Sequence, residues 1–246
     1  MNPRIAGTLL LAGLMVGAAG AQAADSPLVP FHADFHLNRK GLGSGNLTFS
    51  LEKTADGYAY KSDLHTTGLA ALAVREVTQT SSFRVVGGQL QAGTYDYKQT
   101  GNMTDSETIQ FNWDKKSALT DREGKPQQKS HIAPGMSDTQ LINLVVAADV
   151  ATGKLAPEYK FLDHSKVTTY SAKALPDAKL TLGNTTYDTK VVQLNDSSGD
   201  GTATVWLAPV LHYLPVQIHS VDSKSDVTMT MQDITLGGGT PAAASK

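Results

Sequence analysis

The sequence predicts an all-β fold (β-rich α+β), in which an antiparallel sheet of about 10–12 strands packs on one main helix. Apolar and polar residues alternate over 47–52, 109–113 and 227–232. Period-two alternation buries one face of a strand and exposes the other, as in antiparallel sheets. Turn residues separate these runs, and only one longer segment has helical spacing. The three observations together favour a meandering sheet over a helical or α/β fold.

Turn residues stand between the alternating runs. Three two-residue hairpin signals are Asp56-Gly57, Gly87-Gly88 and Gly183-Asn184. A longer polar loop, 195–201, joins two further strands. The alternation changes phase between Met231 and Ile234, which predicts a β-bulge near Asp233.

One segment, 138–150, has the spacing of an amphipathic helix. Ser137 and Gln140 form a capping-box pattern before it, and Gly153 is a plausible stop. The apolar residues that recur at helical intervals are Leu141, Ile142, Leu144, Val145 and Ala148. The helix carries few charges, so we expect it to be buried against the sheet. A shorter apolar piece, 69–73, predicts a helical turn or loop between strands.

The stretch "WLAPVLHYLPVQIHS", residues 206–220, predicts a corner between two strands. Trp206 and Leu207 end one strand, and 209–213 turn the chain. The buried face of the next strand is expected to comprise Leu214, Val216 and Ile218. Pro215 has no backbone donor, so its position must be unpaired or at a sheet edge.

The first residues, 1–23, have the features of a signal peptide that is removed after Ala21-Gln22-Ala23. The apolar run is short for a membrane span, although a retained anchor helix is the alternative. We expect a single β-rich domain over 24–236 and a disordered tail over 237–246. The signal-peptide pattern is typical of bacterial envelope proteins, so we expect the protein to be located in the periplasm.

Composition excludes several classes of function. The chain has no cysteine, so it has neither disulfides nor a lipid-anchored cysteine, and we expect it not to be a lipoprotein. Lys and Arg number 21 against 23 Asp and Glu, without a basic block, which argues against nucleic acid as a partner. Aromatic residues are only 7%, so an outer-membrane barrel is disfavoured and the protein is expected not to span a membrane.

Candidate chemistry is sparse. His32, Asp34 and His36 share one face of a strand, but the opposite face is apolar, so the three are better explained as its solvent side. Asp196 and Asp200 lack the regular spacing of a calcium loop. We therefore predict no catalytic residue, no cofactor and no metal site. A hydrolase with a dispersed site stays as a minor alternative, because sequence order does not reveal one.

Five segments in order resemble a bacterial family of unknown function, DUF3108. They are "FHADFHLNRKGLGSGNLTFSL", "TSSFRVVGGQLQAGTYDY", "IQFNWD", "MSDTQL" and "WLAPVLHYLPVQI". The chain departs from the family pattern at Ala92-Gly93, where Pro is common, and at 209–212, where Asp is common. The resemblance covers about residues 30–236. It implies a curved antiparallel sheet, an open half-barrel similar to the periplasmic lipoprotein carriers, with an apolar concavity.

The resemblance leads to three hypotheses about function. The first is a monomeric periplasmic binding protein or chaperone that holds a lipid, an acyl chain or a hydrophobic segment in the concavity. The second is a structural or interaction module of a cell-envelope assembly, with a protein partner and no small ligand. The third is the dispersed hydrolase, although we expect no enzyme. Candidate ligand-binding residues are Trp113, Leu141, Val145 and Trp206, with Leu69 and Leu72 as a lid.

Overall fold

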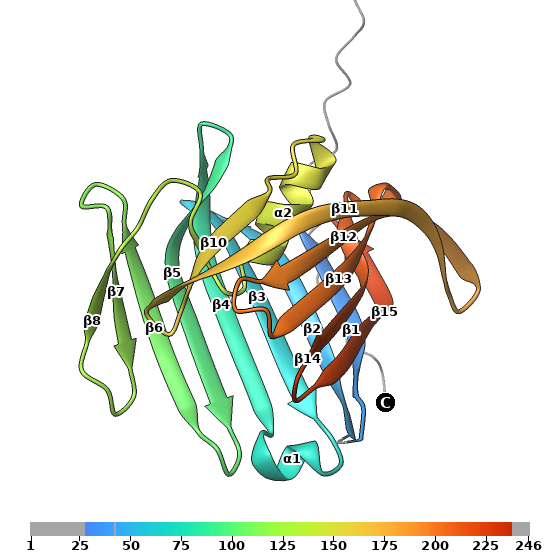
Figure 1. Ribbon diagram of the computed structural model, residues 1–246, viewed down its shortest axis with the longest axis horizontal. Coiled ribbons are helices and arrows are strands. Elements are labelled where there is room, and N and C mark those ends of the chain that lie inside the picture. The colour runs from blue at the N-terminus through green and yellow to red at the C-terminus, as the bar shows by residue number, and fades with distance from the viewer. Residues whose placement is uncertain (1–27, 42, 238–246) are drawn as a thin grey trace, which may run out of the picture.

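The computed structural model describes residues 28–41 and 43–237, and within them fifteen strands form one sheet (Figure 1). The first half contains β1 (Phe31–Arg39), β2 (Gly43–Thr54), β3 (Gly57–Thr66), α1 (Ala70–Ala73), β4 (Glu76–Val86), β5 (Gln89–Thr100), β6 (Asp105–Asn112), β7 (Ser117–Arg122) and β8 (Gln128–His131). The second half contains β9 (Ser137–Asp138), α2 (Ile142–Ala151), β10 (Glu158–Asp163), β11 (Lys166–Leu182), β12 (Thr185–Asp196), β13 (Gly201–Ala208), the 3₁₀ turn η1 (Pro209–Leu211), β14 (Leu214–Asp222) and β15 (Asp226–Leu236).

The sheet is a meander that also joins its first and last strands. Its order runs from β8 back to β1, across to β15, and back through β14 to β9. Every pairing is antiparallel except the short parallel contact of β9 with β10. The predicted class is confirmed. The number of strands is larger than expected because β8 and β9 have only four and two residues and lack apolar alternation.

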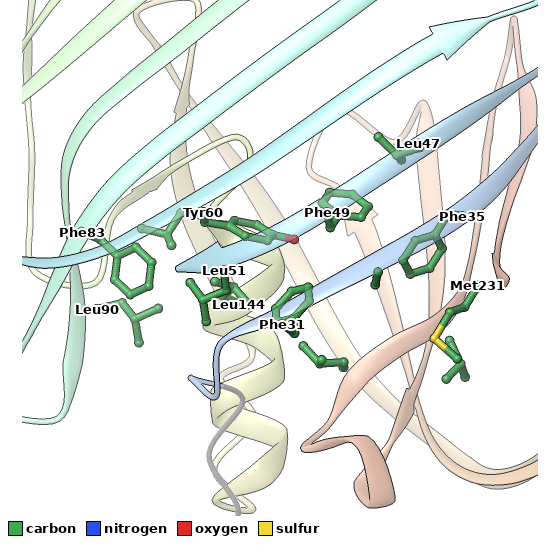
Figure 2. Close-up of a cluster of buried hydrophobic side chains, with 14 of the residues drawn as sticks. Phe31, Phe35, Leu47, Phe49, Leu51, Tyr60, Phe83, Leu90, Leu144 and Met231 are labelled. Atoms are coloured by element: carbon green, nitrogen blue, oxygen red, sulfur yellow. The ribbon is translucent and has the colours of Figure 1, made fainter. Parts of the chain in front are cut away.

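Alternate residues of the central strands form the core on the concave side of the sheet. In β1, Phe31, Ala33 and Phe35 are buried, whereas Asp34 and His36 are exposed, as the sequence predicts. Figure 2 shows the largest group of buried side chains, which includes Phe31, Phe35, Leu47, Phe49, Leu51, Tyr60, Phe83, Leu90, Leu144 and Met231. This group joins both halves of the sheet to α2.

Helix α2 is buried between two parts of the curved sheet. Leu144 packs into the group of Figure 2, while Ile142 and Val146 pack against β10, β12 and β13. Val145 contacts both groups. A helix that is apolar on all sides is stable only where protein surrounds it. The concave side of the sheet is therefore largely filled, and the wide apolar concavity that the resemblance implies is reduced to its margins.

The start of α2 differs from the predicted capping box. Ser137 and Asp138 pair with β10 as strand β9, and the helix begins at Ile142. The Ser137 hydroxyl makes no hydrogen bond within the described residues. Instead, Asp138 Oδ1 accepts hydrogen bonds from the backbone N–H groups of Gln140 (3.0 Å) and Leu141 (2.8 Å). The capping-box prediction was wrong because tertiary pairing with β10 fixes Ser137 in a strand.

Most of the predicted turns and bulges are confirmed. Gly87-Gly88 and Gly183-Asn184 form the two-residue turns of β4–β5 and β11–β12. The turn between β2 and β3 lies one residue earlier than predicted, because Gly57 already belongs to β3. A Cβ at Gly57 would overlap the carbonyl oxygen of Phe83, so the strands approach too closely there for any side chain. The bulge predicted near Asp233 occurs in the β1–β15 pairing.

The predicted corner at 206–220 is confirmed. η1 turns the chain, and Tyr213 N–H donates to the Ala208 carbonyl oxygen at 2.9 Å. The β13–β14 register shifts after Trp206, and pairing of β14 with β15 begins only at Gln217. β14 lies between β13 and β15 in the sheet, but Pro215 precedes the part of β14 that pairs with β15. A proline is tolerated there because that edge of the strand is still unpaired.

The expected signal peptide, residues 1–23, lies outside the described residues, as does the expected tail except for Gly237. None of the helices in the described ranges has the length and hydropathy of a membrane span.

Candidate functional site

The structure does not bring the six predicted ligand-binding residues together. Leu141 is 0% exposed and belongs to the core, and Trp206 is half-buried against the same group of side chains. Leu69 and Leu72 are 68% and 64% exposed. Val145 and Trp113 line two different cavities, which share no lining residue.

The expected lid of the ligand site lies away from α2, which carries the predicted lining residue Val145. Leu69 and Leu72 flank or belong to α1, which Figure 1 shows at one end of the strands, while α2 lies toward the other end. Met103, in the β5–β6 turn, is 61% exposed, and its N–H donates to the Ala73 carbonyl oxygen at 3.0 Å. Leu69, Leu72 and Met103 are thus three exposed apolar side chains on two segments joined by this hydrogen bond, and we call them the α1 patch.

A cavity of about 480 Å³ opens beside α2, and we call it the mouth cavity. The tip of the β4–β5 hairpin, the segment before β9, one side of α2 and the start of β10 enclose it. Its lining residues are Gly88, Gln89, Leu90, Ala133, Pro134, Gly135, Met136, Val145, Ala148, Asp149, Ala156, Glu158, Tyr159 and Lys160. Small-molecule sites usually have volumes of roughly 300–1,000 Å³, so this cavity is large enough for part of an apolar chain.

The mouth cavity has an apolar wall and a polar wall. Leu90 and Met136 are buried, and Val145 and Ala148 of α2 face the cavity between them. The polar wall begins with Asp149, whose carboxylate accepts a hydrogen bond from the Tyr159 hydroxyl at 2.8 Å. The Tyr159 hydroxyl also accepts from the Ala156 N–H at 3.0 Å. Burial raises the pKa of Asp149 above its ordinary value, although the Tyr159 hydrogen bond opposes the change.

Trp113 lines a second, more open groove of about 410 Å³, where β5 and β6 separate. The last pair between these strands is Thr94 with Gln110. Beyond it, Trp113 Nε1–H donates a 2.7 Å hydrogen bond to the Ala92 carbonyl oxygen. The indole also stacks on Phe111, with ring centroids 6.1 Å apart. Trp113 therefore completes the wall of the sheet as well as lining a groove.

Asp138 anchors the start of α2 to the sheet. Its carboxylate is fully buried, and Oδ1 also accepts from the Ser81 hydroxyl of β4 at 2.8 Å. Oδ2 has no hydrogen-bond partner among the described residues. Burial raises the Asp138 pKa to about 6, against the lowering effect of these hydrogen bonds. The sequence signal for this residue is the Asp of "MSDTQL", one of the five segments that carry the resemblance described above.

Sequence reasoning missed a group of charged side chains on the concave face of β6 and β7. Glu107 is buried, and its Oε2 lies 3.0 Å from His164 Nδ1. The signal that could have found it is the phase of β6, since Asp105 and Glu107 occupy the same face as the apolar Ile109 and Phe111. Within the described ranges, no three His, Asp or Glu side chains are grouped to hold a metal ion.

Comparisons with known proteins identify a family and one solved structure of similar fold. A family model described as "Protein of unknown function (DUF3108)" matches residues 33–232. A beta-barrel-like protein of domain of unknown function DUF1849 from Brucella abortus superimposes with a TM-score of 0.60 at 7% identity, covering 86% of this chain and 99% of that chain. MucB in complex with MucA(peri) gives a TM-score of 0.18 at 12% identity, covering 88% and 96%. A search of the curated proteins finds no match.

Proposed function

The chain belongs to the DUF3108 family of proteins of unknown function, and from this premise we propose that it is a periplasmic binding protein. Its ligand is an acyl chain or a short hydrophobic segment that enters the mouth cavity. The protein acts by binding and release without catalysis. The location follows from the signal-peptide pattern of residues 1–23.

The observation that carries this proposal is the apolar wall of the mouth cavity beside α2. Leu90, Met136, Val145 and Ala148 are apolar residues that line a volume of about 480 Å³. Each methylene group that a ligand buries there contributes about 0.8 kcal/mol. Because α2 fills the concavity below, the cavity accommodates one end of a chain and not a whole lipid. Asp149, Glu158 and Lys160 also line the cavity, so the polar end of a ligand meets charges of both signs.

The proposal is tested by native mass spectrometry and by titration with a fluorescent fatty-acid probe. Ala148→Leu adds volume on the face of α2 that lines the cavity, so we expect it to weaken probe binding by about tenfold. Ala151→Leu is the matched control, since Ala151 lies on the same helix outside the lining residues. Because the protein is proposed to bind without catalysis, a ligand that is added to the protein and then recovered from it should have an unchanged mass. Equal probe affinity in both variants, or no binding by the wild type, rejects the mouth cavity as the site.

A second candidate function is favoured by the α1 patch. Leu69, Leu72 and Met103 are each more than half exposed, and the Met103 N–H donates to the Ala73 carbonyl oxygen of α1. We propose that, in this alternative, the patch contacts a protein of the cell envelope. A photo-crosslinking side chain at Leu72 should give a discrete protein adduct in the periplasm, whereas one at Val210, which is 73% exposed, should not. Adducts of equal yield at both positions count against a specific partner.

A further inference from the structure

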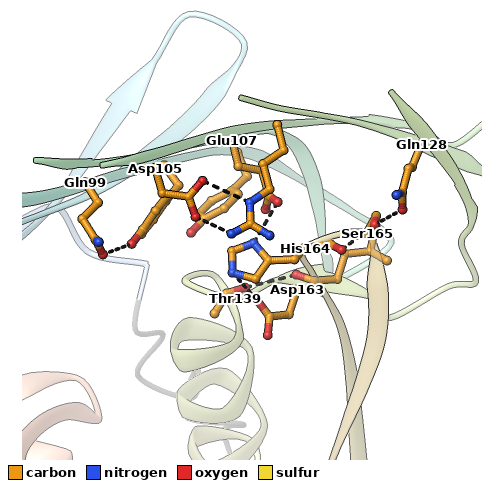
Figure 3. A network of polar contacts seen from close by, with 12 residues as sticks. Gln99, Asp105, Glu107, Gln128, Thr139, Asp163, His164 and Ser165 are labelled. Carbon is orange, nitrogen blue, oxygen red and sulfur yellow. Dashed lines mark hydrogen bonds and ion pairs between the residues drawn. The ribbon is translucent and has the colours of Figure 1, made fainter. Parts of the chain in front are cut away.

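A second polar site lies where the two ends of the curved sheet meet. The β10–β11 turn packs over the concave face of β6, β7 and β8, and between them is a cleft of about 360 Å³, which we call the seam cleft (Figure 3). Its lining residues are Glu107, Thr120, Arg122, Lys125, Pro126, Gln128, Asp163, His164, Ser165, Lys166 and Thr168. The seam cleft and the mouth cavity share no lining residue, so ligand binding in the mouth cavity does not involve the seam cleft.

The turn over the seam cleft has an unusual backbone. His164 and Ser165 both have left-handed conformations, with φ of 48° and 66°. Residues with side chains pay roughly 1–2 kcal/mol each for this geometry. Polar contacts across the seam hold it: Ser130 Oγ donates to the Ser165 carbonyl oxygen at 2.8 Å, and the Ser165 hydroxyl bonds Gln128. The position of the cleft wall is thus fixed by both ends of the sheet.

Two carboxylates that line the seam cleft, and a third beside it, contact basic side chains. Glu107 lies against His164, as Figure 3 shows. Arg122 donates two hydrogen bonds to Asp105, Nε to Oδ1 at 3.0 Å and Nη2 to Oδ2. This contact holds the pKa of Asp105 below its ordinary value. Asp163 also lies 3.7 Å from His164 Nε2, so each of the three carboxylates already contacts a basic side chain.

Three further groups in the cleft are not satisfied. Thr120 is 3% exposed, and its hydroxyl has no hydrogen-bond partner among the described residues. Lys125 and Lys166 lie at the rim on two different hairpins, and in the described ranges the ion pairs of the cleft are those of Arg122 and His164 only. A buried hydroxyl without a partner is costly, and a bound oxygen atom would supply one.

We propose that the seam cleft is a binding site for a small oxyanion, either a carboxylate or a phosphate monoester. Lys125 and Lys166 attract the anion from the two hairpins, and the Thr120 hydroxyl donates a hydrogen bond to one of its oxygens. Charge-assisted hydrogen bonds of this kind are stronger than neutral ones. A bound anion would contact both ends of the sheet, through Lys125 and Thr120 on one side and Lys166 on the other.

The test is an NMR titration of the full protein with inorganic phosphate and, separately, with acetate. We expect amide shifts at Thr120, Lys125 and Lys166 to change together and saturate. Saturation with phosphate but not acetate identifies the phosphate source, and the reverse identifies the carboxylate. Absence of saturating shifts at these amides with either probe overturns the proposal.

Matched variants separate this site from general charge effects. The double variant Lys125→Gln/Lys166→Gln should raise the Kd about tenfold or more, and Thr120→Val about fivefold. Lys154→Gln/Lys224→Gln makes the same change of net charge outside the cleft lining and should leave the Kd unchanged. Equal losses in the two double variants would show nonspecific attraction and overturn the proposal. Ala148→Leu should not affect phosphate binding, so failure of the mouth cavity leaves this test intact.

Discussion

The Trp113 indole donates a 2.7 Å hydrogen bond to the Ala92 carbonyl oxygen, at a point where β5 and β6 no longer pair. A side chain thus replaces one hydrogen bond of the sheet. The contact fixes the end of β6 and one wall of the open groove. It also makes Trp113 important for stability, whichever ligand the protein binds.

Trp113→Phe should lower the free energy of unfolding by about 1–2 kcal/mol, because the Ala92 carbonyl loses its donor. Urea denaturation measures the change. Trp206→Phe is the control, since Trp206 packs against the core and no hydrogen bond of its indole is found in the described ranges. Equal losses in the two variants would assign the effect to ring size instead of the hydrogen bond.

Asp138 should make the protein less stable as the pH rises from about 4 to 6. Its pKa is about 6 in the folded state and 3.8 ordinarily, so folding favours the protonated form. The stabilisation is complete below the ordinary value and is lost as the pH passes the folded value, about 3 kcal/mol in all. Urea denaturation over a pH series measures this slope.

Asp138→Asn should remove that slope while its Oδ1 still accepts from Gln140 and Leu141. Asp121→Asn, at an exposed position, should keep the wild-type slope. A slope that survives in Asp138→Asn would mean that other groups cause it.

Gly57→Ala should destabilise the protein by about 3 kcal/mol or more, because the new methyl group would overlap the Phe83 carbonyl. Gly87→Ala, in the open β4–β5 turn, should cost only about 1–2 kcal/mol for its left-handed φ of 59°. Thermal unfolding of both variants compares the two. A Gly57→Ala protein as stable as Gly87→Ala would contradict the close approach of β3 and β4.

Leu141→Ala should cost about 2–5 kcal/mol, because Leu141 is fully buried in the core. Leu72→Ala should change the stability by less than about 0.5 kcal/mol, since Leu72 is 64% exposed. Chemical denaturation distinguishes the two. A stable Leu141→Ala variant that loses probe binding would restore Leu141 as a ligand-binding residue.

The strands were predictable because the inward positions of β1 and β2 are nearly all apolar. Phe31, Phe35, Phe49 and Leu51 show the period of a half-buried strand without any knowledge of their neighbours. The start of α2 was not predictable, because pairing of Ser137 with Phe161 of β10 overrides the local capping pattern. The local sequence favours a helix cap at Ser137, but pairing with β10 places this residue in a strand.

The candidate sites were harder to predict than the strands. Val145 and Trp113 were selected for their apolar side chains and do line cavities, but the same reasoning selected Leu141 and Trp206, which pack in the core. Glu107 and His164 are 57 residues apart and meet only because the sheet curves back on itself. Alternation along a strand specifies its two faces, but it does not specify the curvature that decides which faces meet.

The pairing of β1 with β15 has a consequence for how the molecule folds. Phe31 lies opposite Leu236, so the first and last strands meet in the middle of the sheet. During synthesis, nearly the whole domain must be made before β15, the second neighbour of β1, is available for pairing. Contacts between residues so distant in sequence slow folding. Until then, β1 and β14 both present open edges that invite wrong partners.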